Sequence, residues 1–174
     1  LIVMLMLAGA LVDSLYSARR IETEYRHHIS ANIGRQITFD KLYAQGLQMG
    51  QALRNVMLDP DNPKAYENYA KAAESFEKLL ASARDADTQH FRSGLPDKIG
   101  TLRGEQRQIH DQLFALVKSG QLDAARSTLN KDETPKWREI RDLLQTEVRR
   151  LDELSPQLFE RLIKQSDQSV QRSI

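Results

Sequence analysis

The sequence predicts an all-α protein: an up-down-up-down four-helix bundle with long first and last helices and both termini at one end. Three observations lead to this fold class. The 174 residues include only 8 Gly and 5 Pro, with 6% aromatic residues, which is a poor composition for the turns and strands of an all-β fold. Apolar residues recur at steps of three and four, as on helix faces. Finally, residues 16–58 and 135–174 predict two end helices that match at about 60 Å each, at 1.5 Å per residue.

Charge and cysteine content exclude several function classes. Lys and Arg number 25 against 24 Asp and Glu, a formal charge of +1, so we expect no nucleic-acid partner. The chain has 0 Cys, which excludes disulfide frameworks, cysteine-ligated zinc, iron–sulfur clusters and thiol nucleophiles. It also contains no Gly-rich phosphate loop and no nucleophile elbow. We therefore expect neither an enzyme nor a bound cofactor.

The first residues are strongly apolar. Residues 1–12 have the sequence LIVMLMLAGALV, and the first charge is Asp13. Twelve residues fall short of the roughly 20 that a helix needs to cross hydrocarbon, but the chain begins at Leu1, so we interpret residues 1–15 as the end of a transmembrane helix. A signal peptide cleaved near Ala8-Gly9-Ala10 and a buried soluble helix are the alternatives. Residues 16–174 then form one domain outside the membrane.

The first helix is predicted over residues 16–58, which contain no Pro. On a helical wheel its apolar residues cover an arc of about 200°, twice the width of the roughly 100° stripe that one neighbouring layer needs. We therefore expect this helix to face its own bundle on one side and a second subunit on the other, giving a homodimer. The residues of the arc are Phe39, Leu42, Tyr43, Gly46, Leu47, Met49, Gly50, Leu53, Val56, Met57 and Leu58.

Turn residues separate the first three helices. Residues 59–63 (DPDNP) predict a sharp hairpin, with Asn62 as the N-cap and Pro63 in the first turn of the second helix. That helix ends before Ser93-Gly94. A third helix follows Pro96, with a strict three-and-four repeat broken only by Gln106, and it stops at Gly120.

The last helix follows a short helical piece at residues 121–131. Thr134 and Pro135 predict its N-cap and first turn, and its apolar stripe continues for nearly five heptads toward Ile174. Pro156 interrupts this stripe, so we expect a kink or a local break there. Because the two long helices carry the chain termini, Ile174 is expected to point back at the membrane that residues 1–12 enter.

Metal and haem sites are weakly indicated. Glu24 and His27 match one Glu-x-x-His step of a di-iron bundle, but none of the other histidines has a Glu three residues earlier. His110 lies beside Ile109 on the third helix, where it either ligates a haem or, as the ordinary alternative, is exposed or hydrogen-bonded. We expect no metal site.

Arg54 is the most informative charged residue. It lies about 60° from the centre of the apolar arc of the first helix, where a desolvated guanidinium needs an anionic partner. At the same height the last helix begins with Trp137, Arg138 and Arg141, and Tyr66 lies nearby on the second helix. These five residues predict a pocket for a small anion, such as a dicarboxylate or an amino acid. The alternative is internal pairing with Glu67, Glu139 or Asp142.

A family resemblance rests on three stretches. Residues 42–60 (LYAQGLQMGQALRNVMLDP), residues 62–66 (NPKAY) and residues 120–125 (GQLDAA) resemble the four-helix-bundle sensor domains of bacterial methyl-accepting chemotaxis receptors. The likeness spans most of residues 16–174. It implies an inner-membrane receptor whose ligand-binding domain faces the periplasm, dimerises through its first helices and binds ligand far from the membrane. It also implies that a small shift of the last helix carries the signal across the membrane.

The input domain alone leaves other outputs open. A sensor histidine kinase uses an equivalent domain, and the coding sequence beyond Ile174 would separate the two, because a kinase carries an ATP-binding domain there. A soluble cofactor-binding bundle is a third reading from another class, which an absorption spectrum would test.

Overall fold

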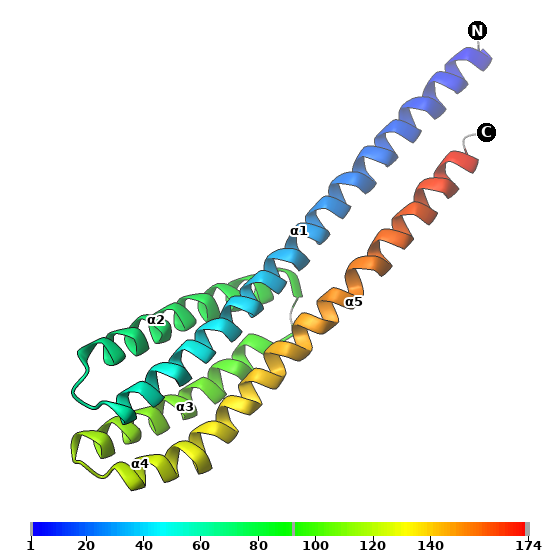
Figure 1. Cartoon of the computed structure of the whole chain (residues 1–174). Coiled ribbons are helices and arrows are strands. Elements are labelled where there is room, and N and C mark those ends of the chain that lie inside the picture. Colours follow the sequence, from blue (N-terminus) through cyan, green and yellow to red (C-terminus); the bar gives the residue numbers. More distant parts are fainter. Residues whose placement is uncertain (1, 92, 173–174) are drawn as a thin grey trace. The chain divides into compact units, whose positions relative to one another are not determined.

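The computed structural model is helical throughout the part of the chain that it describes (Figure 1). It describes the backbone of residues 2–91 and 93–172, and the side chains of residues 29–88, 91 and 93–154 together with Tyr16, Arg19, Thr23, Pro156, Glu160 and Lys164. Within these ranges there is no strand. The predicted all-α class is therefore confirmed.

Five α-helices and two short π-helical segments follow one another in the described part of the chain. The helices are α1 (Ile2–Leu58), α2 (Pro63–Ala86), α3 (Leu95–Lys118), α4 (Leu122–Thr128) and α5 (Thr134–Arg172). The π-helical segments are η1 (Asp87–Phe91), which extends α2, and η2 (Leu129–Glu133), which joins α4 to α5. A π-turn takes in one more residue than an α-turn and so rotates the residues that follow it.

The chain divides into two compact units. The four-helix unit comprises residues 35–148, and the terminal unit comprises residues 1–34 together with residues 149–174. The four long helices of the four-helix unit are α2, α3 and the adjoining parts of α1 and α5, and the unit also contains the short α4. The terminal unit contains the beginning of α1 and the end of α5, so it groups the two ends of the chain.

Several predicted helix boundaries are confirmed. α1 ends at Leu58, and Asn62 caps α2 by accepting a hydrogen bond from the Lys64 backbone N–H at 3.0 Å. Gly120, at φ 74°, ends the turn after α3 in the left-handed conformation that glycine adopts without a Cβ clash. The helix signals near the hairpin and near Gly120 were therefore sufficient to set these boundaries.

The start of α5 differs from the prediction. The sequence predicts Thr134 as the N-cap of this helix, but Thr134 is itself helical, with φ −60° and ψ −43°, and its hydroxyl donates to the Leu129 carbonyl at 2.9 Å. The π-turn of η2 lets the chain pass into Pro135, which has no backbone N–H to donate, without leaving the helical region. Of the kink or local break predicted near Pro156, the break does not occur, because α5 continues through Pro156.

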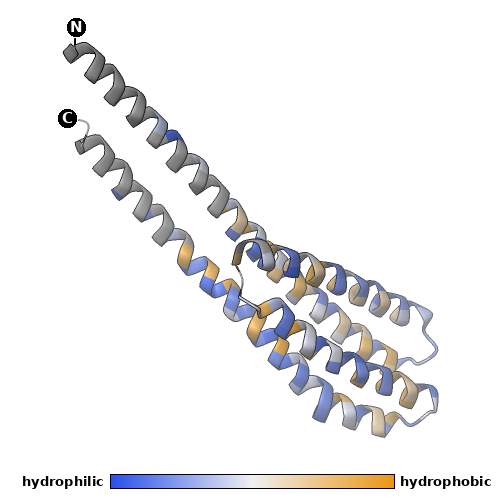
Figure 2. Cartoon of the chain, turned by 180° about the vertical axis from the view of Figure 1, so that it is seen from behind, coloured by the Kyte–Doolittle hydropathy of each residue, from blue (hydrophilic) through white to orange (hydrophobic). Residues whose placement is uncertain are grey.

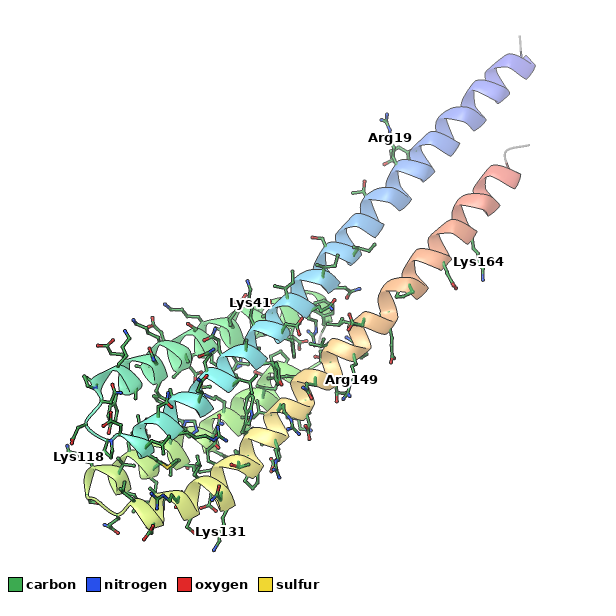
Figure 3. All side chains as sticks on the ribbon, viewed as in Figure 1. Arg19, Lys41, Lys118, Lys131, Arg149 and Lys164 are labelled. Carbon is green, nitrogen blue, oxygen red and sulfur yellow. The ribbon has the colours of Figure 1, made fainter. Side chains whose placement is uncertain are left out.

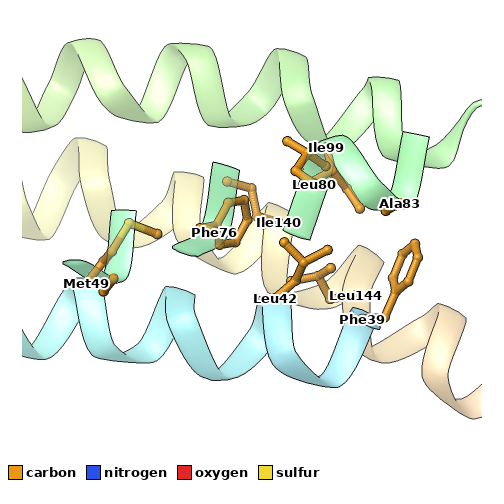
Figure 4. Packing of buried hydrophobic residues seen from close by; sticks show 10 residues of the cluster. Phe39, Leu42, Met49, Phe76, Leu80, Ala83, Ile99, Ile140 and Leu144 are labelled. Atoms are coloured by element: carbon orange, nitrogen blue, oxygen red, sulfur yellow. The ribbon is translucent and has the colours of Figure 1, made fainter. Parts of the chain in front are cut away.

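Two apolar clusters fill the four-helix unit. The first joins α1, α2, α3 and α5, and Figure 4 shows its side chains pointing toward one another from these helices. The second joins α1, α2, α3, α4 and η2. The first cluster contains Phe39, Leu42, Met49, Ala72, Phe76, Leu80, Ala83, Ile99, Ile140 and Leu144; the second contains Leu53, Val56, Ala65, Leu113, Val117, Ala125 and Leu129.

The buried face of α1 follows a single stripe. Its buried positions step by four and three residues, and hydrophobic and hydrophilic residues alternate accordingly along the helices (Figure 2). They are Arg35, Phe39, Leu42, Gly46, Met49, Leu53 and Val56, with Ala52 beside them. The rest of the predicted wide arc is only partly covered: Tyr43, Gly50 and Met57 are half-buried, whereas Leu47 is 46% exposed and Leu58 81% exposed.

No helix is long and apolar enough to span a membrane among the residues that the structure describes. The side chains of residues 1–12, which the sequence predicts to end a transmembrane helix, lie outside the described residues.

Candidate functional site

The four-helix unit contains two groups of polar side chains that are buried except for the half-buried Tyr69 and the exposed Ser93. The Arg35 cluster consists of Arg35, Asp87, Ser93 and Glu147, and the His110 cluster consists of Tyr69, Arg103, Gln106, His110 and Glu133. Burying a charged or polar group costs free energy unless it is hydrogen-bonded. Buried polar clusters are therefore places to look for a role beyond stability. These two clusters are therefore the candidate functional sites.

Arg35 joins three parts of the four-helix unit. From α1 its Nε donates to Glu147 Oε1 on α5 at 2.6 Å, and its Nη1 donates to Asp87 Oδ1 in η1 at 2.7 Å. Its Nη2 donates to Ser93 Oγ at 2.8 Å. The guanidinium also lies 5.0 Å from the ring centre of Phe39 and 4.3 Å from that of Phe91. One buried cation thus holds α1, α5 and the α2–α3 connection together.

Asp87 owes its position to the π-turn that begins with it. Ser93 Oγ donates to Asp87 Oδ1 at 2.6 Å, and the Gly94 backbone N–H donates to Oδ2 at 2.8 Å. Burial opposes ionisation of this carboxyl, but the hydrogen bonds from Ser93, Arg35 and Gly94 outweigh it and lower the pKa of Asp87 to about 2. Asp87 is therefore anionic at neutral pH.

The His110 cluster lies between α2, α3 and η2. His110 is fully buried, and Tyr69 of α2 and Glu133 of η2 contact its two ring nitrogens. The Tyr69 hydroxyl lies 2.7 Å from Nδ1, and Glu133 Oε1 lies 3.4 Å from Nε2. Gln106 Nε2 donates to the same carboxylate oxygen at 3.1 Å. Gln106 therefore interrupts the apolar stripe of α3 because it binds Glu133.

The hydrogen bonds of His110 define its tautomer. An ionised Glu133 only accepts, so the proton of a neutral His110 lies on Nε2, and Nδ1 accepts from the Tyr69 hydroxyl. Burial lowers the pKa of His110, and the bond to Glu133 acts against this effect. Burial raises the pKa of Tyr69. At neutral pH the Tyr69 hydroxyl and the His110 imidazole are therefore both neutral.

Arg103 borders this chain on α3. Its side chain is buried, its Nη1 donates to Gln106 Oε1 at 3.2 Å, and its guanidinium lies 5.6 Å from the ring centre of Phe76. Its Nε lies 3.2 Å from Oε1 of the half-exposed Glu77, without the alignment of a hydrogen bond. The cluster thus holds one guanidinium and one carboxylate inside, with a second carboxylate at its edge.

The structure describes all five residues of the predicted anion site. Arg54 is exposed rather than desolvated, and its Nη1 donates to the Gly50 carbonyl one turn back on α1 at 3.0 Å. It lies outside the buried stripe, which is why it needs no internal partner. Arg138 is exposed on α5, while Arg141 is half-buried and binds Asp142 Oδ1 through Nε at 2.9 Å and Nη2 at 2.7 Å. Other cations also point away from the four-helix unit, as Figure 3 shows for Lys41, Lys118 and Lys131.

The two aromatic residues of that predicted site are packed. Trp137 lies against the first apolar cluster, and its ring stacks on Tyr43 at 6.2 Å between centres. Tyr66 lies against the second cluster, with its ring centre 5.7 Å from that of Phe114, and its hydroxyl donates to the Pro60 carbonyl at 3.0 Å. The two rings thus belong to different clusters.

The three carboxylates named for internal pairing all have cationic neighbours. Asp142 binds Arg141, whereas Glu67 binds Lys64 and Glu139 binds Lys136, each at 3.1 Å. Internal pairing is therefore observed for Arg141. Whether the five predicted residues bind an anion stays a prediction.

Five residues of the observed clusters were missed in the sequence, namely Arg35, Asp87, Arg103, Glu133 and Glu147, and two of them continue a repeat that the sequence shows. Arg35 is the next member, four residues before Phe39, of the stripe through Phe39, Leu42 and Met49, so the same repeat indicates its burial. Glu133 lies four residues after Leu129, on the side that the sequence assigned to Leu122, Ala125 and Leu129. Extending both repeats by one step would have found both residues.

Among the described residues, no three His, Cys, Asp or Glu side chains lie close enough together to hold a metal ion. Glu24 and His27, the predicted Glu-x-x-His step, have side chains outside the described residues. Comparison of the chain with protein-family models, with curated proteins and with solved structures found no match.

Proposed function

We propose that the chain is the extracytoplasmic sensor domain of a transmembrane chemoreceptor. In this proposal it is an up-down-up-down bundle with both termini at the cytoplasmic membrane, and it works as a homodimer in the periplasm. It binds a small anion or a partner and relays a helix shift across the membrane to control chemotaxis signalling. It has no catalytic role.

Helix length is the observation that carries this proposal. α1 has 57 residues and α5 has 39, whereas α2 and α3 have 24 each. The surplus of α1 and α5 makes up the terminal unit, which groups the two ends of the chain. Both α1 and α5 continue from the four-helix unit into the terminal unit. A displacement of one of these helices relative to the other could therefore carry a signal from a sensing part to the two ends of the chain.

The surface of α1 supports a homodimer. The positions Ile37, Asp40, Ala44, Leu47, Gln51, Arg54 and Leu58 are all exposed and step by three and four residues, which is the spacing of a helix–helix seam. Large apolar residues on such a seam favour contact with a second helix, because that contact removes them from water. A parallel pairing of two α1 helices would bring two copies of Arg54 toward each other.

Arg54 then suits an anionic ligand. Among the described side chains no carboxylate pairs with it, since its guanidinium donates to the Gly50 carbonyl. Two such groups facing each other repel, and a small dicarboxylate or amino acid between them relieves that repulsion through charge-assisted hydrogen bonds. Arg138 and Arg141 on α5 are the further candidates for the same ligand, with Trp137 and Tyr66 as walls.

A chimeric receptor tests the function. The chain is joined in frame to the second span and cytoplasmic part of a known chemoreceptor, and kinase activity is measured against a panel of organic acids and amino acids. We expect at least one acid to change kinase activity, and Arg54→Ala to raise its half-maximal concentration at least about tenfold. Lys41→Ala, which removes another exposed cation of α1, should leave the response unchanged.

Two outcomes would count against the proposal. If a chimera that inserts into the membrane and dimerises responds to none of the acids, the proposed small-anion ligand is wrong. If the Arg54→Ala and Lys41→Ala variants respond equally, the proposed binding site at Arg54 is wrong. The coding sequence beyond Ile174 separates a chemoreceptor from a sensor histidine kinase, and an absorption spectrum with metal analysis tests the cofactor-binding bundle.

A further inference from the structure

The His110 cluster contains a complete hydrogen-bond chain that none of the proposed receptor steps uses. It runs from the Tyr69 hydroxyl through both ring nitrogens of His110 to Glu133 Oε1. His110 is fully buried and Glu133 is 2% exposed, so solvent does not screen the contacts between them. A chain of this kind has two arrangements that differ by one proton.

We propose that Tyr69, His110 and Glu133 form a buried proton-binding site, in which a proton taken up on His110 Nδ1 reverses the hydrogen bond with Tyr69 and ties the ring ionically to Glu133. In the neutral state the Tyr69 hydroxyl donates to Nδ1. In the protonated state Nδ1–H donates to the Tyr69 oxygen, and the Tyr69 hydroxyl keeps its own proton, which rotates away from Nδ1. The added charge faces the Glu133 carboxylate, so the pair becomes a cation and an anion in contact.

The groups around the ring decide whether a proton can enter. From η2 the carboxylate of Glu133 favours the cation, and from α3 Asp111 favours it while Arg103 opposes it. From α2 the ring meets Tyr69, and Glu77 on the same helix pairs with Arg103 and reduces its opposition. The buried side chains of α1 between residues 39 and 56 are uncharged, and Lys136 of α5 binds Glu105 and Glu139. Burial itself lowers the pKa of His110, so His110 takes up a proton only at pH values below neutral.

Proton uptake at this site acts on the start of α5. Glu133 is the last residue of η2 and directly precedes Thr134, the first residue of α5, whose hydroxyl binds the Leu129 carbonyl within the same π-turn. A stronger pull of His110 on Glu133 therefore draws η2 and the first turn of α5 toward α3. The proton site does not depend on the proposed receptor function, but within such a receptor it makes acid an input to the helix that carries the signal.

A histidine titration by nuclear magnetic resonance tests the site directly. The full chain, held in mild detergent and labelled with ¹⁵N in histidine and in the backbone, is followed from about pH 8 to about pH 5. His110→Gln identifies the His110 signals among the four histidines, and His90→Gln is the matched control. At high pH we expect His110 to be the neutral Nε2–H tautomer. As the pH falls, we expect His110 to become the imidazolium while circular dichroism still shows a helical protein. The backbone signals of residues 129–136 should shift with the same midpoint pH as His110.

Two variants test the assigned partners. Glu133→Gln keeps the shape but removes the charge, so the proton affinity of His110 should fall at least about tenfold and the coupled movement of residues 129–136 should disappear. Tyr69→Phe should also lower the affinity, because a buried cationic N–H then lacks its acceptor. His110 that stays neutral until the protein unfolds overturns the proposal, as does a titration without movement of residues 129–136. Both of these results are measured on the wild-type protein, so they test the proposal even if a variant does not fold.

Discussion

Gly46 of α1 lies directly against the indole ring of Trp137 on α5. A Cβ built on Gly46 would overlap the six-membered part of that ring, and the same ring stacks on Tyr43 one turn earlier on α1. The absence of a side chain at residue 46 therefore lets α1 and α5 approach each other in the four-helix unit. This contact gives Trp137 a packing role whether or not it also lines a ligand site.

Gly46→Ala should destabilise the protein because the new methyl group forces the indole out of its place. The expected loss in the free energy of unfolding is about 1–3 kcal/mol, measured by urea unfolding. Gly104→Ala is the matched control: it also replaces a glycine inside a helix, but its Cβ meets nothing within 4 Å, so helix propensity should add up to about 1 kcal/mol. Trp137→Phe should restore part of the stability lost by Gly46→Ala. Equal stabilities of the two alanine variants would refute the close approach.

Arg35→Met should be strongly destabilising. It leaves the carboxylates of Asp87 and Glu147, whose side chains are 9% and 7% exposed, without the cation that joins them, which costs about 3–5 kcal/mol of unfolding free energy. The unfolding free energy of Arg35→Lys should lie between those of the wild type and of Arg35→Met, since Lys keeps the charge but lacks the several N–H donors of the guanidinium. Arg84→Met is the control, because Arg84 pairs with the exposed Asp97 and should lose less than about 1 kcal/mol. A loss at Arg35 no greater than that at Arg84 would show that the cluster does not hold the helices.

Asp87 should make the protein sensitive to strong acid. Its pKa is lowered from 3.8 to about 2, so its contribution of about 2 kcal/mol is fully present above about pH 4 and disappears as the pH falls through about 2. Asp87→Asn removes the ionisable group, so the wild-type and variant unfolding free energies should differ above pH 4 and converge toward pH 2. Unfolding in urea at a series of pH values measures both. A constant difference across this range would mean that the hydrogen bonds of Asp87 do not depend on its charge.

The sequence predicted the helices better than the polar interior. Helix ends follow from local chemistry, as at Asn62 and Gly120, where a cap and a left-handed glycine are visible in a few residues. Arg35 and Glu133 each lie one step beyond an apolar repeat, so a search that counts apolar residues alone stops before it reaches them, although the spacing itself includes them. The π-turns at 87–91 and 129–133 have no compositional signal. An extra residue in a turn shifts the helical phase of the residues that follow it, but it does not require a particular residue type. The wheel of α1 was wide because it contains two stripes, and only packing shows that Arg54 lies on the exposed one.

The exposed stripe of α1 should hold two copies of the chain together. It combines Leu47, 46% exposed, with Ile37 and Leu58, so a charge placed in its middle would be buried in the dimer without a partner. We therefore expect Leu47→Asp to weaken dimerisation at least about tenfold by analytical ultracentrifugation, with an unchanged helical spectrum. Gln48→Asp adds the same charge to the neighbouring exposed position, which lies off the stripe, and should have little effect. If both variants dimerise like the wild type, the dimer uses another surface, and Arg54 loses the arrangement that would bring two guanidinium groups to one anion.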